Sequence, residues 1–288
     1  MDRVGARQRT SDDAPPADHD AGGLRLWRSG VLAGVSSAPQ EALAAAFAVG
    51  HEAALRRVHQ RATLLWPGAS GVIVKRYERG VWGDALRDWR ARGSVRSVAR
   101  REAENLEELA RAGVPTPRAL GWCGSDGWRG VTKPSALWME RVEHSRDLRE
   151  ELARDRGAAE RWRDELARLA ARLHAGGWRH RDLYLQHWLV SARGLVLIDV
   201  GRCEREPGMR ERWFVKDLAA LEMSCPANVT VRSRLRCAAR YFKERGLSNR
   251  AAKLELLASV RAKARRMASH APRYVDPHER SAAVGREA

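Results

Sequence analysis

The sequence predicts an α+β fold in two lobes, with a β-rich N-terminal lobe and a mostly helical C-terminal lobe. Short apolar runs separated by glycine- and proline-containing turns dominate the first half of the 288-residue chain, whereas stretches with helical periodicity dominate the second half. One small hairpin pattern interrupts the helices of the second half. With 44% hydrophobic residues, the chain can bury a core in each lobe.

The chain is expected to divide into three segments. Residues 1–23 contain almost no large apolar side chains, so they are predicted to be a disordered polar tail. Residues 24–143 are assigned to the N-terminal lobe, although their Ala-rich part up to about Gln60 fits either a first strand or a short helix. Residues 144–288 are assigned to the C-terminal lobe, with the seam between the lobes near Glu143.

The elements of the N-terminal lobe follow from turn signals. The stretch "ATLLWPGASGVIVKRY" is an apolar run, a turn and a β-branched run, which predicts a β-hairpin. A helix is predicted from about Val95 to Ala112 because Gly113 and Pro115 end the pattern there. The runs "LGWCG" and "SALWMERV" are predicted to be strands.

In the C-terminal lobe, a long amphipathic helix is predicted from Ala158 to Ala175, because its large apolar side chains form one stripe. The runs "HWLV" and "LVLID", joined by "SARG", predict a short hairpin after this helix. Three more helices are predicted from their apolar periodicity, at Arg212–Ser224, Val231–Arg245 and Asn249–Met267.

The composition limits the class of protein. The four cysteines form no C-x-x-C pair, so neither a disulfide framework nor a zinc site is expected. No apolar run approaches the roughly 18 residues needed to cross a bilayer, and we expect a cytoplasmic protein. The net charge of +17 favours anionic partners. Nearly all of the positive residues are arginines, and part of this excess can reflect a lineage that uses arginine in place of lysine. The charge alone therefore does not favour a nucleic acid as the partner.

Two aspartates flank the short hairpin of the second half. The first ends His180-Arg181-Asp182, and Asp199 begins Asp199-Val200-Gly201. In protein kinases, an H-R-D loop supplies a catalytic aspartate, and the aspartate of a D-x-G turn after the next strand binds Mg²⁺. An H-R-D tripeptide alone can arise by chance in an arginine-rich chain. The glycine-terminated helix before it and the hairpin after it favour a phosphotransferase.

A lysine and a glutamate provide an independent indication. Lys75 ends the β-branched run "GVIVK" in a chain where lysine is scarce, and Glu102 lies on the apolar face of the next predicted helix. A carboxylate on an inward face needs a cation, and Lys75 is the expected one. Two alternatives remain open, namely a surface lysine and a pair between Glu102 and Arg101. The turn "PGASG" can approach phosphates or be a plain hairpin turn.

Together, these motifs resemble those of the lipopolysaccharide kinase family, whose kinase-fold members phosphorylate heptose or Kdo sugars of the lipopolysaccharide inner core. The likeness extends over roughly residues 61–273 and is most specific in "HRDLYLQHWLV", "LIDVGR" and "RWFVKDLAAL". The resemblance implies a protein-kinase-like fold with ATP as co-substrate and Mg²⁺ as cofactor. It implies that Asp182 is the catalytic base, that Asp199 is the main Mg²⁺ ligand, and that Lys75 and Glu102 position the phosphates. Asp217 is similar to the buried aspartate that braces the catalytic loop.

The resemblance also suggests roles for three further residues. His187 stands where protein kinases have a second metal-binding asparagine, so it is expected to bind metal weakly or to contact phosphate, and a structural role is equally open. Backbone groups of Glu140 and Val142, in the segment "WMERV", are expected to meet the adenine.

We therefore expect an ATP-dependent kinase that acts on a sugar hydroxyl of a lipopolysaccharide core or a related cell-envelope glycolipid. No A-P-E element and no long activation segment follow Asp199, which favours a glycan or small molecule over a peptide as acceptor. Peripheral contact with the cytoplasmic face of the inner membrane would suit an anionic glycolipid. The alternatives are a kinase of another small molecule or of a protein, and a non-catalytic pseudokinase that binds nucleic acid or lipid.

Overall fold

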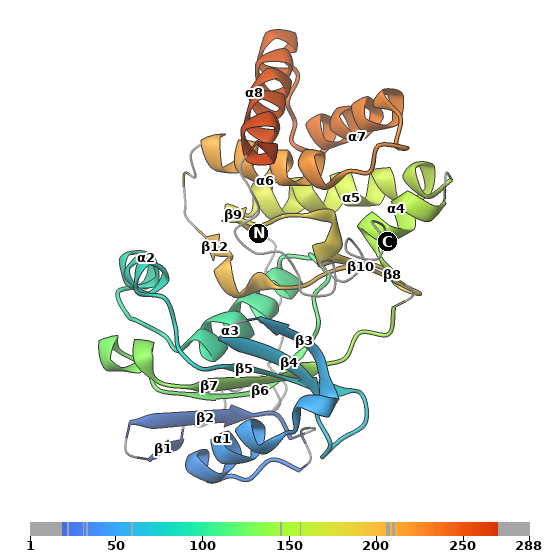
Figure 1. Ribbon diagram of the computed structural model, residues 1–288. Helices are drawn as coiled ribbons and strands as arrows, with labels where there is room; N and C mark the ends of the chain where they lie inside the picture. The colour runs from blue at the N-terminus through green and yellow to red at the C-terminus, as the bar shows by residue number, and fades with distance from the viewer. Residues whose placement is uncertain are drawn as a thin grey trace, which may run out of the picture.

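The computed structural model describes residues 19–21, 23–30, 32, 34–58, 60–144, 146–155, 157–205, 208 and 211–269. These residues form two lobes, one built on an antiparallel sheet and the other mainly on helices, so the predicted α+β fold is confirmed (Figure 1). Most of the predicted polar tail lies outside the described residues. Its residues 19–21 form a short strand.

The N-terminal lobe is built on one sheet in which every neighbouring pair of strands is antiparallel, in the order β1-β2-β6-β7-β5-β4-β3. The predicted hairpin is confirmed as β4 and β5, and the two predicted strands are β6 and β7. The strands are β1 (His19–Ala21), β2 (Leu24–Arg28), β3 (Ala54–Val58), β4 (Arg61–Leu65), β5 (Val72–Tyr77), β6 (Ala119–Gly124) and β7 (Ser135–Glu140).

Helices cover both faces of this sheet. Helix α1 (Pro39–Ala48) packs on the outer face, and α3 (Val98–Arg111) packs on the face that looks toward the C-terminal lobe (Figure 1). Helix α3 begins later than the predicted residue 95, because the Ser97 hydroxyl accepts a hydrogen bond from the Arg100 amide and caps the helix there. It ends before Gly113, whose φ of 76° favours glycine.

Two parts of the N-terminal lobe differ from expectation. The ambiguous segment before Gln60 contains both strands and a helix, namely β2, α1 and β3. Helix α2 (Trp82–Arg92) was not predicted, because its large apolar residues do not form an inward stripe. Its buried positions are only Ala85 and Asp88.

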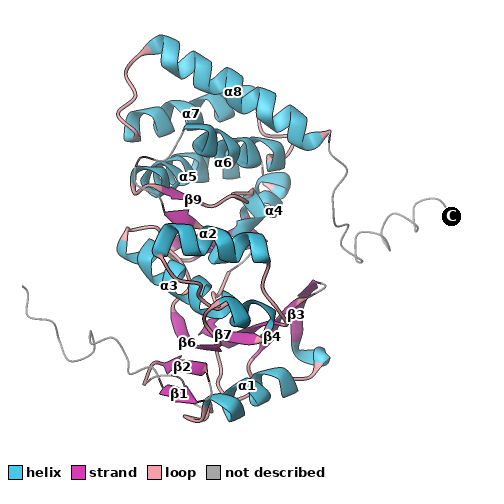
Figure 2. Ribbon diagram, turned by 90° about the vertical axis from the view of Figure 1, so that its left-hand side faces the viewer, coloured by secondary structure: helices cyan, strands magenta, loops and turns pink. Residues whose placement is uncertain are grey.

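The C-terminal lobe is a stack of helices above the N-terminal lobe (Figure 2). The predicted hairpin is confirmed as β10 paired with β11, and the predicted long helix is α5 with the expected bounds. Helix α4 was not predicted. The elements are β8 (Arg146–Asp147), α4 (Leu148–Arg154), α5 (Ala158–Ala175), β9 (Trp178–Arg179), β10 (Trp188–Ser191), β11 (Gly194–Leu197), β12 (Glu204–Arg205), α6 (Glu211–Ser224), α7 (Val231–Glu244) and α8 (Arg250–Ala268).

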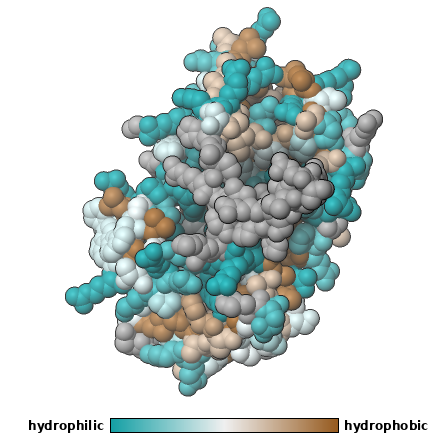
Figure 3. Space-filling view, in the orientation of Figure 1, coloured by the Kyte–Doolittle hydropathy of each residue, from teal (hydrophilic) through white to brown (hydrophobic). Residues whose placement is uncertain are grey.

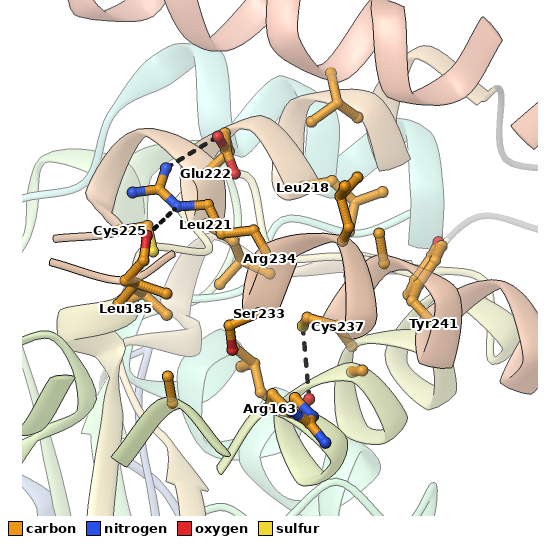
Figure 4. A pocket seen from close by; sticks show the side chains of 18 of the residues that line it. Arg163, Leu185, Leu218, Leu221, Glu222, Cys225, Ser233, Arg234, Cys237 and Tyr241 are labelled. Carbon is orange, nitrogen blue, oxygen red and sulfur yellow. Dashed lines mark hydrogen bonds and ion pairs between the residues drawn. The ribbon is translucent and has the colours of Figure 1, made fainter. Parts of the chain in front are cut away.

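A cavity of about 200 Å³ opens among α5, α6, α7 and α8 (Figure 4). Its lining is mainly apolar, and none of the seven residues predicted for the site lines it.

Within the described ranges, no helix combines the length and apolar character that a membrane span requires.

Candidate active site

Lys75 and Glu102 form an ion pair between strand β5 and helix α3. Because side chains alternate along a strand, Lys75 and Tyr77 point to the α3 face of the sheet, while Arg76 points to the α1 face and donates to the Phe47 carbonyl. The Lys75 Nζ lies 2.6 Å from the Glu102 Oε1. The predicted pair is thus present, and both alternatives for it were wrong.

Glu102 is almost completely buried, and its second oxygen accepts a hydrogen bond from the Tyr77 hydroxyl. Burial and the nearby Glu102 carboxylate raise the pKa of Tyr77 well above its ordinary value, so the hydroxyl stays a donor. Arg101 is engaged elsewhere, because its Nε donates to the Gly201 carbonyl at 2.9 Å. The Lys75 ammonium is therefore held by a carboxylate that is itself fixed.

Asp199 extends this pair into a cluster of charges. Its Oδ1 lies 4.0 Å from the Lys75 Nζ and 3.3 Å from the Arg61 Nη1. Burial would raise the pKa of Asp199, but the positive charges of Lys75 and Arg61 outweigh burial and hold this pKa well below its ordinary value. The carboxyl group is therefore ionised at neutral pH.

The turn that carries Asp199 is fixed to helix α3. Asp199 has a φ of 58°, a left-handed conformation that is uncommon for a residue other than glycine. The Asn105 side chain donates to the carbonyls of Val200 and Cys203 at 2.9 and 3.0 Å. A Cβ atom on Gly201 would lie 2.6 Å from the Glu102 Oε2, so only glycine fits this position without a shift. One helix therefore supplies the partner of Lys75 and the support of Asp199.

Asp182 lies in the loop between β9 and the 3₁₀ turn η4 (Leu185–His187). Its Oδ2 lies 2.7 Å from the Arg202 Nη1, and its backbone carbonyl accepts hydrogen bonds from the Tyr184 amide at 2.8 Å and the His187 Nδ1 at 2.7 Å. His187 also faces the other aspartate, with its Nε2 3.8 Å from the Asp199 Oδ2. His187 therefore links the segments of Asp182 and Asp199.

The geometry around His187 fits a cation. A carbonyl can only accept, so the His187 Nδ1 carries the proton, and the neutral ring then presents a lone pair at Nε2. Burial lowers the pKa of His187 more than the Asp199 charge raises it, which favours this neutral ring at pH 7. Two acceptor atoms, the His187 Nε2 and the Asp199 Oδ2, thus face each other 3.8 Å apart.

Among the described residues, no group of three or more His, Cys, Asp or Glu side chains forms a metal cage. Mg²⁺ often uses only one or two carboxylates together with waters and phosphate oxygens. The donor set of Asp199 and His187 is compatible with such an ion bound beside a nucleotide.

Asp217 on α6 binds the backbone of the loop that contains Asp182. It is fully buried, and its two oxygens accept hydrogen bonds from the backbone amides of His180 at 2.7 Å and Arg181 at 2.8 Å. Arg181 has a φ of 75°, a conformation that costs about 1–3 kcal/mol for a residue other than glycine. The two hydrogen bonds to Asp217 offset that cost.

The Asp217→Asn variant is expected to unfold more easily, because an amide cannot accept from two backbone amides as a carboxylate does. The expected loss is about 1.5–3 kcal/mol in the free energy of unfolding, the range for hydrogen bonds to a charged group. Urea denaturation measures this loss. Asp164→Asn on α5 is the matched control, because Asp164 is exposed. Equal urea midpoints for the two variants would contradict this function of Asp217.

The segment that joins the lobes contains Glu140 and Val142. The Glu140 amide already donates to the Arg118 carbonyl at 2.9 Å, and the Val142 carbonyl lies 2.8 Å from the His144 Nδ1. Two backbone groups of this pair are therefore already engaged. The Glu140 carbonyl and the Val142 amide take no part in these two contacts.

Two cations of the cluster were not predicted from the sequence. Arg61, the exposed first residue of β4, contacts Asp199, and Arg202 contacts Asp182. Neither position differs in local pattern from the many other arginines of the chain. The only available signal was that Arg202 follows the Asp199-Val200-Gly201 turn directly.

The chain is similar in sequence to several known proteins. Residues 49–241 match the model of the lipopolysaccharide kinase (Kdo/WaaP) family. The chain is 31% identical over 222 residues to lipopolysaccharide core heptose(I) kinase WaaP of Pseudomonas aeruginosa, covering 72% of this chain and 82% of that protein. It is 35% identical over 158 residues to 3-deoxy-D-manno-octulosonic acid kinase of Xanthomonas campestris, covering 53% of this chain and 60% of that kinase.

A third relative, 3-deoxy-D-manno-octulosonic acid kinase of Haemophilus influenzae, is 28% identical over 165 residues, covering 55% of this chain and 67% of that protein. The solved bifunctional kinase-methyltransferase WbdD is a distant structural neighbour, with a TM-score of 0.41 and 19% identity over 72% of this chain and 43% of that chain. The family match covers most of the chain. It includes every residue of the charged cluster, namely Arg61, Lys75, Glu102, Asp182, His187, Asp199 and Arg202. The chain therefore belongs to the lipopolysaccharide kinase (Kdo/WaaP) family and is a kinase phosphotransferase.

Proposed function

We propose that this protein transfers the γ-phosphoryl group of ATP to a sugar hydroxyl of a lipopolysaccharide core or a related cell-envelope glycolipid. The main support is the approach of the Lys75–Glu102 pair to Asp199, at 4.0 Å between the Lys75 Nζ and the Asp199 Oδ1. A held ammonium next to an ionised carboxylate is the pair that kinases use on a metal-bound triphosphate. The relatives named as heptose(I) and 3-deoxy-D-manno-octulosonic acid kinases support a sugar acceptor.

In this proposal, Lys75 contacts the α- and β-phosphates, and Glu102 fixes the direction of its ammonium. Asp199 is the main ligand of Mg²⁺, and the His187 Nε2 is a weaker one, because Mg²⁺ prefers oxygen. When bound, the metal neutralises charge that develops on the transferred group. The Glu140 carbonyl and the Val142 amide bind the edge of the adenine, since the other backbone groups of these residues are engaged.

Asp182 orients the acceptor hydroxyl and takes its proton. The hydroxyl oxygen forms a bond to the γ-phosphorus as the bond from that phosphorus to the β–γ bridging oxygen breaks, and ADP leaves with the electron pair of the broken bond. The Arg202 guanidinium, 2.7 Å from the Asp182 Oδ2, has to yield part of this contact to the hydroxyl. Only residues 200–210 separate Asp199 from α6, a short segment that favours a compact acceptor over an extended peptide.

Phosphotransfer to a panel of acceptors tests the proposal. The full chain is incubated with γ-labelled ATP and Mg²⁺, together with deacylated core oligosaccharides that carry heptose or 3-deoxy-D-manno-octulosonic acid, or with mixed Ser/Thr/Tyr peptides. We expect label on a sugar, and loss of this label in EDTA. Label on peptides but not on sugars would disprove the proposed acceptor, and transfer that persists in EDTA would disprove the metal.

A further inference from the structure

Three tryptophans gather on the surface of the N-terminal lobe. Trp82 and Trp89 come from α2, and Trp128 comes from the 3₁₀ turn η3 (Trp128–Thr132). The rings of Trp82 and Trp128 stack with centroids 6.3 Å apart, and those of Trp89 and Trp128 are 6.2 Å apart. The three side chains are 56%, 46% and 42% exposed, in the order Trp82, Trp89 and Trp128. Such a cluster is unusual on a surface that has no partner.

The large apolar side chains of α2 point away from the protein. Trp82, Leu86 and Trp89 are spaced by four and three residues, so they share one face of the helix, and all three are exposed. Ala85, three residues after Trp82, lies at the edge of this face and is buried against Val95 and Val131. Val81, 60% exposed, extends the outward face. We call Val81, Trp82, Leu86, Trp89 and Trp128 the tryptophan patch, and Figure 3 shows a mixed apolar surface over α2.

The acidic residues of α2 do not face the same way as the patch. Asp84 pairs with Arg87 and lies 3.0 Å from the Arg181 Nη1, and Asp88 is buried against Arg96. Exposed cations instead flank the patch in the sequence, in α2, in η3 and in the segments just before α2 and just after η3. These cations are Arg79, Arg90, Arg129 and Lys133. None of the four forms an ion pair with another residue that the structure describes.

We propose that the tryptophan patch and its cations dock this protein on the surface of an anionic lipid bilayer. Indole rings favour the level of the lipid headgroups, and arginine and lysine are attracted to anionic headgroups. A helix with an apolar outer face and cationic flanks lies in the plane of the membrane interface. A second copy of the chain fits less well, because a two-fold interface would bring the same cations together.

The position of α2 relative to Asp182 connects docking with the reaction, and this step rests on the proposed function. Asp84 contacts Arg181, the residue before Asp182, and the Arg202 Nε lies 3.9 Å from the Asp84 Oδ2. Arg202 in turn contacts Asp182. Helix α2 therefore lies between the tryptophan patch on its outer face and the Asp182 loop on its inner face, so we infer that a sugar attached to a lipid beside α2 can reach the base.

Vesicle flotation with the full chain tests the docking surface. Vesicles of phosphatidylethanolamine with phosphatidylglycerol are compared with vesicles of phosphatidylcholine alone, without ATP or acceptor. We expect binding to the anionic vesicles only. The Trp82→Ser/Trp89→Ser variant should bind at least about tenfold more weakly, since the apolar anchor is lost. The Arg90→Gln/Arg129→Gln variant should bind about fivefold more weakly for each arginine removed.

Matched controls lie on the other lobe. Arg149→Gln/Arg154→Gln removes two exposed arginines from α4, and Leu254→Ser removes an exposed apolar side chain from α8, and neither should change binding. The proposal is overturned if the chain binds no vesicle, if it binds neutral vesicles equally, or if the controls weaken binding as much as the patch variants. It is also overturned if Trp82→Ser/Trp89→Ser converts a dimer into a monomer, because the patch then covers another protein chain.

The test separates docking from catalysis. Flotation needs no phosphotransfer, so an inactive protein that floats with anionic vesicles supports docking while the proposed function fails. If the protein is active, the tryptophan variant should raise KM for a vesicle-borne glycolipid and leave KM for its deacylated, water-soluble form unchanged. An equal change in both values would overturn the proposed orientation of the site toward the bilayer.

Discussion

Replacing Asp182 by asparagine is expected to lower kcat about a thousandfold, within the range of about 10²–10⁴ for loss of a general base. The amide cannot take the proton of the acceptor hydroxyl, although it has nearly the same shape as the carboxyl group. The Asp182 carbonyl still accepts from the His187 Nδ1, so the loop and the metal-binding face of His187 should persist. Affinity for Mg²⁺–ATP should therefore be almost unchanged.

Two measurements decide this prediction, namely kcat with the identified acceptor and nucleotide affinity by titration in the presence of Mg²⁺. Asp164→Asn, an exposed residue on α5, controls for a general effect of losing a carboxylate. A pseudokinase, the non-catalytic alternative, would retain full function in Asp182→Asn. Loss of nucleotide affinity together with kcat would place Asp182 among the nucleotide-binding groups instead.

The sequence predicted Lys75, Glu102, Asp182 and Asp199 because each of them lies in a recognisable local pattern. Lys75 ends a β-branched run, Glu102 sits on the apolar face of a capped helix, and Asp182 and Asp199 flank a hairpin whose strands are short and apolar. Each of these patterns fixes the direction of one side chain. Glu102 and Asp199 come to 2.6 Å and 4.0 Å from the Lys75 Nζ because α3 packs between the sheet and the Asp199 turn.

The unpredicted parts are those where tertiary contacts outweigh local pattern. Helix α2 has its large apolar residues on the outward face, so periodicity gave no sign that it packs on the protein through Ala85. Strand β3 carries Leu55, which is 50% exposed, at a sheet edge, and therefore lacks the alternation of a half-buried strand. No local pattern distinguishes Arg61 and Arg202 from the other arginines of the sequence. Only the fold places them next to Asp199 and Asp182.

Helix α3 joins Lys75 of the N-terminal lobe to the Asp199 turn of the C-terminal lobe. Along one helix, Arg101 and Asn105 bind backbone carbonyls of the Asp199 turn, and Glu102 binds Lys75. A movement of α3 would therefore separate Lys75 from Glu102 and release the turn at the same time. Because Gly201 lies against Glu102 with no room for a Cβ atom, the two sets of contacts depend on each other.

The Lys75→Met variant is expected to lose about 10²–10³-fold in kcat, the effect of removing one preorganised electrostatic group. It should also be less stable, because Glu102 is buried and would keep only the Tyr77 hydroxyl as partner among the contacts described above. Removing one partner of a buried ion pair typically costs about 3–5 kcal/mol. Urea denaturation and kcat are measured on the same preparation.

The double variant Lys75→Met/Glu102→Gln separates these two effects. A neutral glutamine still accepts from the Tyr77 hydroxyl and leaves no buried charge, so most of the lost stability should return. Activity should not return, because no cation faces the phosphates. The stability changes are therefore expected to be strongly non-additive, whereas kcat stays at the level of Lys75→Met. Recovery of kcat with stability would show that Lys75 supports the fold without contacting the nucleotide.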